Sequence, residues 1–408
     1  MSKLDELIQK LYPDGVEYKT LGEIATDIFR GAGIKRDEVT ESGIPCVRYG
    51  EIYTTYGVWF DTCVSHTDES KIASKKYFEH GDILFAITGE SVEDIAKSCA
   101  YVGHERCLAG GDIVVLKHNQ DPKYLGYALS TADARNQKSK GKVKSKVVHS
   151  SVPAIKEIRI PVPPLEVQRE IVRILDNFTE LIAELTAELT ARKLQYEYYR
   201  DELLRLESAP RMKLADISTA MYRGAGIKRD EVTAEGTPCV RYGEIYTSYD
   251  IAFSECKSHT NPEVVASPKY FEHGDILFVI TGESVEDIAK SIAYIGHDKC
   301  LAGGDIVVMK HEQNPRYLSY ALSTTDARNQ KSKGKVKSKV VHASVPSLQE
   351  IEIPVPSLTE QKRIADLLDK FHALCNDIGT GIPAEIEARR KQYEYYRDKL
   401  LTFREVGA

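Results

Sequence analysis

Several features that mark other classes of protein are missing from this sequence. No run of about 18 or more apolar residues occurs, and the opening MSKLDELIQK lacks the apolar core of a secretory signal. The cysteines include no C-x-x-C arrangement, which suits reduced thiols better than a disulfide framework. We therefore expect no membrane segment and a protein that stays in the cytoplasm.

The sequence also lacks an overall positive charge and the common catalytic motifs. Its net charge is −6, so any polyanion binding must come from local patches. No G-x-S-x-G elbow, H-E-x-x-H pair or glycine fingerprint for a nucleotide or methyl donor is present. We expect a non-catalytic chain that carries no cofactor of its own.

The dominant feature of the sequence is an internal duplication. The segment Gly31–Pro163 matches Gly224–Pro356, with 101 of the 133 positions identical. The composition, 42% hydrophobic and 28% charged, is that of a folded globular protein. Because the repeat is far longer than a solenoid unit, each copy should be a whole domain.

Each copy has the pattern of a mixed domain. Short apolar bursts such as Asp82–Ile87 and Asp112–Leu116 lie between glycine pairs and polar turns, as strands do. Helical spacing is confined to segments such as Pro122–Thr131. These patterns predict an α+β domain of roughly 150 residues with a twisted sheet.

A long amphipathic helix is predicted after each copy. The segments IPVPPLEVQREI and IPVPSLTEQKRI open these stretches, and apolar residues then recur at three-four spacing over residues 171–203 and 364–400. The first helix should be continuous, whereas the glycines and proline of Gly379–Pro383 should break the second. A long helix with one apolar face is not stable alone in water. We therefore expect the two helices to bury these faces against each other as an antiparallel coiled coil.

These patterns predict four segments and a two-fold relationship. The expected fold class is α+β, with two similar domains related by pseudo-two-fold symmetry and separated by two long antiparallel coiled-coil helices. The expected boundaries are residues 1–163 for the first domain, 164–207 for the central spacer helix, 208–356 for the second domain and 357–408 for the C-terminal spacer helix.

The sharpest local signal is a basic strip that is identical in the two copies. The strip RNQKSKGKVKSK occupies Arg135–Lys146 and recurs as Arg328–Lys339, without an acidic residue. Cations spaced mostly two residues apart suit contact with successive phosphates, although a lone charge run is usually a solvated loop. The predicted contacts are Arg135, Asn136, Lys138, Lys140, Lys142 and Lys144 in the first copy and Arg328, Asn329, Lys331, Lys333, Lys335 and Lys337 in the second.

Three further polar sets recur in both copies. In RGAGIKR two glycines permit close approach of the backbone to a ligand, and arginine fits the two major-groove acceptors of guanine. VRYGEIY adds an arginine beside tyrosines, and ITGES adds small polar groups; a strand-end or turn role is the alternative for each residue. The candidates are Arg30, Lys35, Arg36, Arg48, Tyr49, Thr88, Glu90 and Ser91, with Arg223, Lys228, Arg229, Arg241, Tyr242, Thr281, Glu283 and Ser284 as their counterparts.

Each copy also contains a C-x-x-H pair and an H-x-x-C pair. They are Cys63 with His66 and His104 with Cys107, repeated as Cys256 with His259 and His297 with Cys300. Two cysteines and two histidines could hold zinc, but their order and separation match no zinc module, and buried free cysteine is common. We therefore predict no metal site.

The helix segments carry a family resemblance. IPVPPLEVQREIVRILD and IPVPSLTEQKRIADLLD, with the endings LQYEYYRDELL and KQYEYYRDKLL, resemble the specificity subunit of type I restriction-modification systems along the full chain. The TAELTAEL sequence in the first helix resembles the spacer helix of one branch of that family. The resemblance implies two target-recognition domains that each read one half of a bipartite double-stranded DNA target, while the helices set the gap and dock two methyltransferase subunits. S-adenosylmethionine, ATP and magnesium would belong to those partners and to restriction/translocase subunits.

The near identity of the two domains departs from that family's usual pattern, in which the domains differ. Two equivalent domains related by a two-fold axis read the same base sequence, each on a different strand and in the same 5′ to 3′ direction. We therefore predict an interrupted palindrome as the target. Differences such as Trp59 against Ala252 and Val64 against Lys257 would spoil this symmetry if they lie at the bases. Adding or deleting one TAEL unit should move a domain by roughly 6 Å and change only the gap.

Two other interpretations remain open at the level of the sequence. In a structural scaffold the domains would bind protein, and the coiled coil would only assemble a complex. A nuclease would use acidic clusters such as those of Glu79–Asp82 and Glu90–Asp94 with magnesium.

Overall fold

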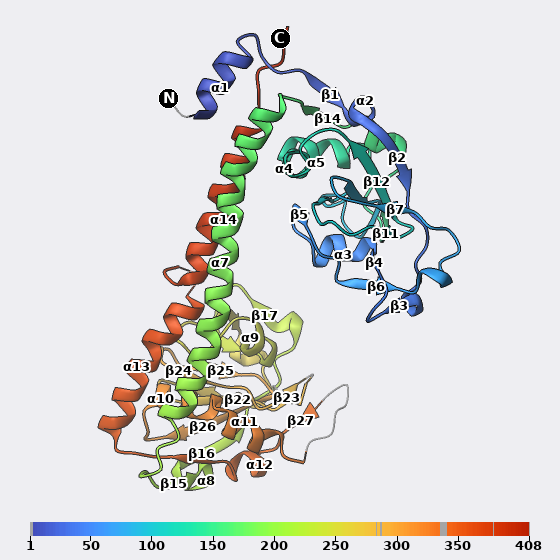
Figure 1. The fold of residues 1–408 in the computed structure, drawn as a ribbon. Coiled ribbons are helices and arrows are strands. Elements are labelled where there is room, and N and C mark those ends of the chain that lie inside the picture. The colour runs from blue at the N-terminus through green and yellow to red at the C-terminus, as the bar shows by residue number, and fades with distance from the viewer. Residues whose placement is uncertain (1–2, 283, 286–287, 335–340, 378, 408) are drawn as a thin grey trace. The chain divides into compact units, whose positions relative to one another are not determined.

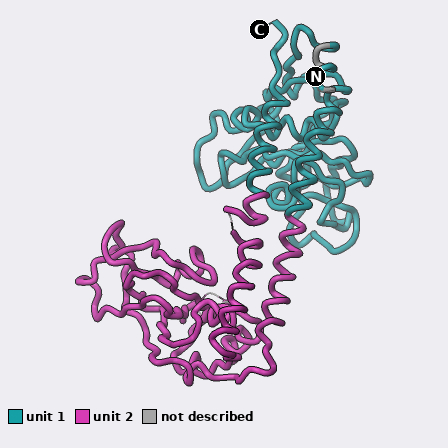
Figure 2. The backbone as a smooth tube through the Cα atoms, turned by 90° about the vertical axis from the view of Figure 1, so that its left-hand side faces the viewer, with its two compact units in different colours: residues 1–185, 386–408 teal, residues 186–385 magenta. Residues whose placement is uncertain are grey.

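Each copy of the repeat folds around two five-stranded sheets in the computed structural model, which describes residues 3–282, 284–285, 288–334, 341–377 and 379–407. The chain divides into unit 1, residues 1–185 with 386–408, and unit 2, residues 186–385 (Figure 2). Each unit takes in one globular domain and parts of both long helices. This division cuts through the helices and so does not decide the domain boundaries predicted from the sequence.

The first sheet of unit 1, sheet A, is buried on both faces. It comprises, in order, β2 (Ala25–Arg30), β12 (Ile113–His118), β8 (Ile83–Ala86), β10 (Ser98–Tyr101) and β5 (Trp59–Phe60). The pair β10–β5 is parallel and the other pairs are antiparallel. Along β8, Ile83 and Phe85 join one core cluster, whereas Leu84 and Ala86 join another. This alternation is the two-residue period of a strand with apolar neighbours on both sides.

The second sheet of unit 1, sheet B, shares a core with sheet A. It comprises β3 (Val39–Thr40), β6 (Ser65–Thr67), β4 (Ile44–Val47), β11 (Cys107–Ala109) and β7 (Tyr77–Phe78), with β4 and β11 parallel. Val47 and Phe78 of sheet B meet Leu84 and Tyr101 of sheet A in one cluster. Two short ladders complete the strands, β1 (Tyr18–Thr20) with β14 (Arg159–Pro161) and β9 (Thr88–Gly89) with β13 (Val148–His149).

Helices cover the other face of sheet A. The short helices of unit 1 are α1 (Lys3–Leu11), α2 (Leu21–Ile24), α3 (Tyr49–Thr54), α4 (Pro122–Ala128), α5 (Ala132–Ser139) and α6 (Val152–Lys156). Tyr124 and Leu125 of α4 share a core cluster with Val167 and Ile171 of the long helix that follows the domain. The domain is therefore a layered α+β structure, as the sequence pattern predicts.

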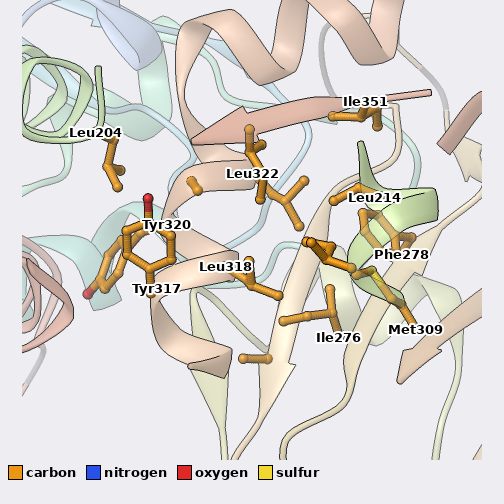
Figure 3. Packing of buried hydrophobic residues seen from close by; sticks show 14 of the residues in the cluster. Leu204, Leu214, Ile276, Phe278, Met309, Tyr317, Leu318, Tyr320, Leu322 and Ile351 are labelled. Carbon is orange, nitrogen blue, oxygen red and sulfur yellow. The ribbon is translucent and has the colours of Figure 1, made fainter. Parts of the chain in front are cut away.

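Unit 2 repeats this architecture element by element. Its sheet A comprises β16 (Ser218–Arg223), β26 (Ile306–His311), β22 (Ile276–Val279), β24 (Ser291–Tyr294) and β19 (Ala252–Phe253), and its sheet B comprises β17 (Val232–Thr233), β20 (Ser258–Thr260), β18 (Thr237–Val240), β25 (Cys300–Ala302) and β21 (Tyr270–Phe271). The remaining elements are β15 (Arg211–Lys213) with β28 (Glu352–Pro354), β23 (Thr281–Gly282) with β27 (Val341–His342), α8 (Leu214–Ile217), α9 (Tyr242–Thr247), α10 (Pro315–Ser323), α11 (Thr325–Ser332) and α12 (Val345–Gln349). Figure 3 shows Leu318 of α10 near Ile276 of sheet A in the core of this unit.

The long helices follow the predicted pattern. The first, α7, is continuous over Leu165–Leu203, whereas the second stretch is divided into α13 (Leu358–Asn376) and α14 (Ile382–Leu400) (Figure 1). Gly381 lies at the break, where a Cβ would stand 2.6 Å from the carbonyl oxygen of Ala373. The predicted interruption is confirmed. Among the helices of the described residues, none combines the length and the apolar character needed to span a bilayer.

Within each unit the helix segments run antiparallel. In unit 1 the Tyr18 hydroxyl donates to the Phe403 carbonyl oxygen at 3.2 Å, and Tyr18 pairs with Pro161, so the chain after α14 lies beside the chain before α7. In unit 2, β15 follows α7 and pairs with β28, which precedes α13. The antiparallel pairing predicted from the apolar stripes is therefore confirmed inside each unit.

The helix–helix contact repeats in the two units with the helices exchanged. In unit 1 the Phe178 ring stacks on Tyr396 with centroids 5.5 Å apart, and in unit 2 the Phe371 ring stacks on Tyr199 at 6.4 Å. Phe178 and Phe371 are equivalent positions of the repeat, as are Tyr199 and Tyr396. Each unit thus combines the first part of one long helix with the last part of the other.

A buried glutamine fastens each helix start to its domain. The Gln168 side-chain oxygen accepts from the Asp121 amide at 2.9 Å, and its Nε2 donates to the Pro163 carbonyl oxygen at 2.7 Å. Gln361 makes the equivalent bonds in unit 2. The glutamine in each helix-opening segment therefore has a structural role that the sequence pattern did not reveal.

Candidate nucleic-acid interface

An open groove on unit 2 brings together two of the sets predicted from the sequence. RGAGIKR contributes Arg223 and Arg229, VRYGEIY contributes Arg241 and Tyr242, and the loop Gly303–Asp305 closes the groove. The residues that line it are Arg223, Gly224, Gly226, Ile227, Arg229, Arg241, Tyr242, Gly243, Glu244, Thr247, Gly303, Gly304 and Asp305. We call this surface, with its counterpart on unit 1, the arginine groove.

Every residue that lines the arginine groove has an identical counterpart in the first copy of the repeat. The counterparts are Arg30, Gly31, Gly33, Ile34, Arg36, Arg48, Tyr49, Gly50, Glu51, Thr54, Gly110, Gly111 and Asp112. The differences noted in the sequence, Trp59 against Ala252 and Val64 against Lys257, lie outside this set. The two copies therefore present the same groove chemistry.

The first glycine of RGAGIKR holds two loops together. A Cβ at Gly224 would stand 2.2 Å from the carbonyl oxygen of Gly303, and one at Gly31 would stand 2.2 Å from that of Gly110. Only glycine permits so close a contact between two backbone segments. This glycine is required for the contact between the two loops, and Gly224 also lines the groove. At Gly226, in contrast, a Cβ would meet no atom within 4 Å.

The first arginine of RGAGIKR is held by the same loop. Arg30 Nε donates to the Gly111 carbonyl oxygen at 2.5 Å, and its guanidinium pairs with the Asp112 carboxylate at 2.6 Å. Arg223 makes the matching contacts, including an ion pair with Asp305 at 2.7 Å. About two of the five N–H groups are used in this way, so the exposed side chain keeps donors for a ligand.

The arginine of VRYGEIY rests on a buried carboxylate. Arg48 donates to Glu51 from its terminal nitrogen at 2.9 Å and from Nε at 3.1 Å. Glu51 is only 7% exposed and also accepts from the Ser65 hydroxyl at 2.6 Å. In unit 2, Arg241 pairs with Glu244 at 3.5 Å. This network fixes the direction of the guanidinium, which is how a residue that positions a ligand is preorganised.

Exposed aromatic and cationic side chains surround these fixed arginines. Tyr49 and Tyr242 are 40% and 45% exposed and begin α3 and α9. Arg36 and Arg229 lie on short 3-10 turns and are also exposed. The neighbouring Lys35 and Lys228 have side chains 77% exposed, each near a glutamate three residues on. Tyrosine and arginine in this arrangement suit stacking and base-edge contacts.

The basic strip is partly helical, and one of its lysines is buried in each copy. Lys138 lies in α5, and its ammonium donates to the Ser98 hydroxyl at 3.0 Å and the Leu129 carbonyl oxygen at 2.8 Å. Lys331 makes the same contacts in unit 2. Burial lowers the pKa of Lys138 and of Lys331 to about 7. The assignment of these two lysines to phosphate contact is wrong, because their charged ends face the protein interior.

The rest of the strip is more accessible. Exposed residues are Arg135, Asn136, Lys140 and Lys144 in unit 1 and Arg328, Asn329 and Lys333 in unit 2. Lys142 is half-buried and donates to the His149 carbonyl oxygen at 2.8 Å. Gly141 has φ +73°, so α5 ends in a left-handed turn. Lys335 and Lys337 lie outside the described residues.

The ITGES set lies beside the end of the strip. Thr88 of β9 faces His149 of β13, with Oγ1 and Nδ1 3.2 Å apart, and Thr281 faces His342 at 3.4 Å. Glu90 is exposed. The Ser91 hydroxyl donates to Glu93 at 2.6 Å, Ser284 is half-buried, and Glu283 lies outside the described residues.

Helix α3 connects the groove with the ITGES set. Tyr49 at its start borders the groove, whereas the Tyr53 hydroxyl lies 2.7 Å from where a Cβ of Gly89 would stand and bonds the Ala86 carbonyl oxygen at 3.3 Å. The four sets therefore form two neighbouring groups on each domain. Sequence reasoning missed Asp112 and its counterpart Asp305; the identical GGD segments in both copies were the available signal.

The cysteine and histidine pairs do not come together as a ligand set. Cys63 lies beside Cys107, whereas the His104 ring stacks on His80 with centroids 5.2 Å apart. Among the residues that the structure describes, no three histidine, cysteine or acidic side chains are arranged to hold a metal. The prediction about metal binding stays a prediction.

Comparison with known sequences places both halves of the chain in one family. The family model of the type I restriction modification DNA specificity domain matches residues 13–192 and 211–388. The Escherichia coli type I restriction enzyme EcoR124I/EcoR124II specificity subunit is 33% identical over 267 residues, which are 61% of this chain and 63% of that protein. The chain thus spans just under two thirds of that relative's length.

Two further relatives are matched over more of their length. A putative type I restriction enzyme specificity subunit of Haemophilus influenzae is 30% identical, over 64% of this chain and 68% of its own. A putative type I specificity subunit of Mycoplasma pneumoniae is 32% identical, over 72% and 85%. A solved chain from a study of complex assembly and conformational transition of the type I R-M system shares the fold, with TM-score 0.67, 17% identity and coverage of 96% and 98%.

Proposed function

The chain belongs to the family of type I restriction modification DNA specificity domains, and from this premise we propose that it is the DNA-recognition subunit of a type I restriction-modification complex. Each globular domain contacts one half of a bipartite double-stranded target through its arginine groove. The observation that carries the proposal is the groove itself, whose arginines and tyrosine are identical in the two copies.

Base recognition is the role of the groove. Arg223 is hydrogen-bonded to Asp305, so its remaining donors are fixed in direction before DNA arrives, and Arg241 forms an ion pair with Glu244 at 3.5 Å. Arginine donates to both major-groove acceptors of guanine, and each such contact discriminates by about 1–3 kcal/mol. Fixed arginines beside an exposed Tyr242 therefore favour sequence-specific contact over phosphate contact alone.

Phosphate contact is the role of the accessible part of the strip. Lys140 and Lys144 are exposed and follow the end of α5, near the ITGES set. Cations of this kind add affinity that does not depend on sequence and that falls with salt. The acidic net charge of the chain is compatible with this role because the cations are concentrated in one short segment.

The target is an interrupted palindrome. Two grooves of identical composition read the same bases, and two domains related by a two-fold axis would read them on opposite strands. The paired helices set the gap between the half-sites. The two copies differ at 32 positions of the repeat (133 − 101), and all of these lie outside the groove lining. The proposal of a palindrome therefore rests on the groove residues and not on the whole domain.

The helices dock the partner subunits, and the chemistry belongs to those partners. Leu194, Tyr198 and Tyr395 are 65%, 62% and 61% exposed on α7 and α14, and these apolar side chains are available for contact with a partner protein. The partners are two methyltransferase subunits, with S-adenosylmethionine, and restriction/translocase subunits, with ATP and magnesium. The complex works in the cytoplasm, and this chain is its non-catalytic part.

Selection from a pool of random duplexes tests DNA recognition. The chain is assembled with its modification subunits, bound duplexes are recovered over several rounds, and their sequences are compared. We expect enrichment of two short motifs at a fixed separation. Enrichment of no motif would contradict the proposal and favour a protein-binding scaffold. An assembly carrying Arg36→Ala and Arg229→Ala is the matched control, in which one position of each motif should relax.

A further inference from the structure

Two cysteines far apart in the sequence meet inside each globular domain. The Cys63 thiol donates a hydrogen bond to the Cys107 sulfur across 3.5 Å, and the two residues are 5% and 0% exposed. Cys256 and Cys300 are the equivalent residues in unit 2, where each is the first cause of the shift in the other's pKa. The pairing occurs in both copies although the block around Cys63 is among the most divergent parts of the repeat.

The two sulfurs of a pair are not equivalent. The Cys107 sulfur also lies 3.4 Å from the Tyr101 hydroxyl. The hydrogen bond that Cys63 donates outweighs burial and lowers the pKa of Cys107, whereas the bond to Cys107 and burial raise the pKa of Cys63. The Tyr101 hydroxyl accepts from Cys107 and donates to the Glu105 carbonyl oxygen. Cys107 is therefore the better thiolate, and Cys63 is a thiol in contact with it. A thiolate beside a second thiol is the arrangement of an oxidisable pair.

Each pair lies directly behind the arginine groove. Cys107 begins β11, which is hydrogen-bonded to β4, and β4 leads into Arg48. Cys63 stands two residues before Ser65, whose hydroxyl bonds the buried Glu51 that holds Arg48. A change in the separation of the two sulfurs therefore acts on both segments that position this arginine.

We propose that Cys63 with Cys107, and Cys256 with Cys300, are sites of reversible disulfide formation by hydroperoxides. The Cys107 thiolate attacks one oxygen of hydrogen peroxide, the O–O bond breaks, and the hydroxide released takes a proton to become water. The sulfenic acid left on Cys107 is attacked by the Cys63 sulfur, which gives up its proton as the second water leaves. Two thiols and one peroxide become one disulfide and two waters, with sulfur oxidised and peroxide reduced.

Disulfide formation alters the groove. The sulfurs move from 3.5 Å apart to a bond of about 2.05 Å, and β11 is tied to the segment that carries Ser65. Resting on the proposed function, we expect oxidation to displace Arg48 and Arg241 and to weaken target binding by about tenfold for each arginine–base contact that is lost.

The two pairs differ in access. Cys63 is buried, whereas its counterpart Cys256 is half-buried. A peroxide molecule therefore reaches the pair in unit 2 first. Cys46 and Cys99 are buried and serve as internal controls, since no cysteine is placed to form a hydrogen bond with either among the described residues.

Peptide mapping tests the dithiol proposal. The full chain, assembled with its modification subunits, is treated with hydrogen peroxide, unfolded, alkylated and digested for mass spectrometry. We expect linked peptides for both pairs, with Cys256–Cys300 forming first, reversal by dithiothreitol, and alkylated Cys46 and Cys99. Free Cys63 and Cys107 after treatment that oxidises an added small dithiol would overturn the proposal, as would random links among the cysteines.

Variants separate the dithiol from its effect on DNA. In Cys63→Ser and Cys256→Ser chains the links should be absent, and DNA affinity should no longer respond to peroxide. Linked peptides with unchanged affinity in the natural chain would overturn the connection to the groove. Peptide mapping needs no DNA, so failure of the proposed function shows separately, as absence of target binding by the fully reduced assembly.

Discussion

Unit 1 and unit 2 share their groove and differ in how the domain is attached to the helices. In unit 1 the Lys123 ammonium lies 3.6 Å from the Trp59 ring centroid and pairs with Asp176 of α7 at 2.8 Å. In unit 2, Arg316 replaces the lysine and pairs with Asp366 of α13 at 2.8 Å. The substitutions that separate the copies thus include the contacts with the helices, whereas the groove is unchanged.

An ion pair adds a second attachment in unit 2. His372 of α13 bonds the Asp250 carboxylate at 2.8 Å, and this hydrogen bond lowers the pKa of Asp250. The equivalent positions in unit 1 are Thr179 and Gly57, which cannot form an ion pair. The comparison shows that the residues in contact with the long helices differ between the copies while those of the arginine groove do not. Variants should therefore separate effects on domain attachment from effects on DNA binding.

The largest effect is expected where the units are joined. Inserting one TAEL unit after Leu185 lengthens α7 by roughly 6 Å and leaves both grooves intact. Binding of the assembled complex to the original target should fall by about a thousandfold, to the non-specific level. Affinity should return on a duplex whose gap is longer by about two base pairs. An Ala-Ala-Ala-Ala insertion at the same point is the control, and an unchanged optimal gap would contradict the account.

The next effect separates the two kinds of lysine in the strip. Lys138→Ala leaves the Leu129 carbonyl oxygen and the Ser98 hydroxyl without their buried partner, so the free energy of unfolding should fall by about 2 kcal/mol. Lys140→Ala, at an exposed position, should change it by less than about 0.5 kcal/mol. Urea unfolding followed by circular dichroism measures both. Equal stability of the two variants would show that Lys138 is not held as described.

The buried lysine also predicts a pH dependence. The folded pKa of Lys138 is about 7, below the ordinary lysine value of 10.5. Between these values the unfolded chain binds more protons than the folded chain, so this group makes the free energy of unfolding rise with pH. Lys138→Met, which keeps the volume and removes the charge, should reduce that rise in unfolding experiments above pH 7 and leave the contribution of Lys331, whose pKa is lowered in the same way. A rise of the same size in the variant would assign it to other groups.

Matched arginine variants compare the grooves directly. Arg36→Ala and Arg229→Ala should each reduce discrimination at one base pair by about 1–3 kcal/mol, and at the same position of opposite half-sites. Competition binding with single-base variants of the target measures this. Relaxation at different positions for the two variants would show that identical grooves do not dock identically.

The smallest effects concern phosphates and the extra ion pair. Lys140→Ala with Lys144→Ala should weaken binding to all sequences and reduce the salt slope by about 2. Asp250→Gly, which copies unit 1, should cost under about 1 kcal/mol, because the Asp250 side chain is 60% exposed although that of His372 is 20% exposed. Its contribution is lost as pH falls through the lowered pKa of Asp250, so acid titration of the natural chain and the variant should differ only in that range.

The sequence was sufficient for the architecture but not for individual side chains. A repeat of whole-domain length, an unbroken apolar stripe and the residues Gly379–Pro383 predict two domains, a continuous α7 and a broken partner helix, because these features depend on local periodicity. The burial of Lys138 was missed, since a lysine run is normally solvated. Its spacing of four from Ala134, also buried, was a signal for one face of a helix.

Contacts made across the fold were the least predictable. The partner of Arg30 is Asp112, 82 residues further along the chain, and the partner of Cys63 is Cys107 rather than His66. Spacing along the chain does not fix such pairs, because strand order decides them. Identical sequence in the two copies identifies important segments, but it does not show which of these segments are in contact in the fold.

Sequencing the methylated positions in the genome of a host that carries this chain with its modification subunits tests the central claim most directly. Identical grooves predict one gapped motif whose two halves are reverse complements, with methylated bases placed symmetrically on the two strands. Two unrelated half-sites would contradict the account.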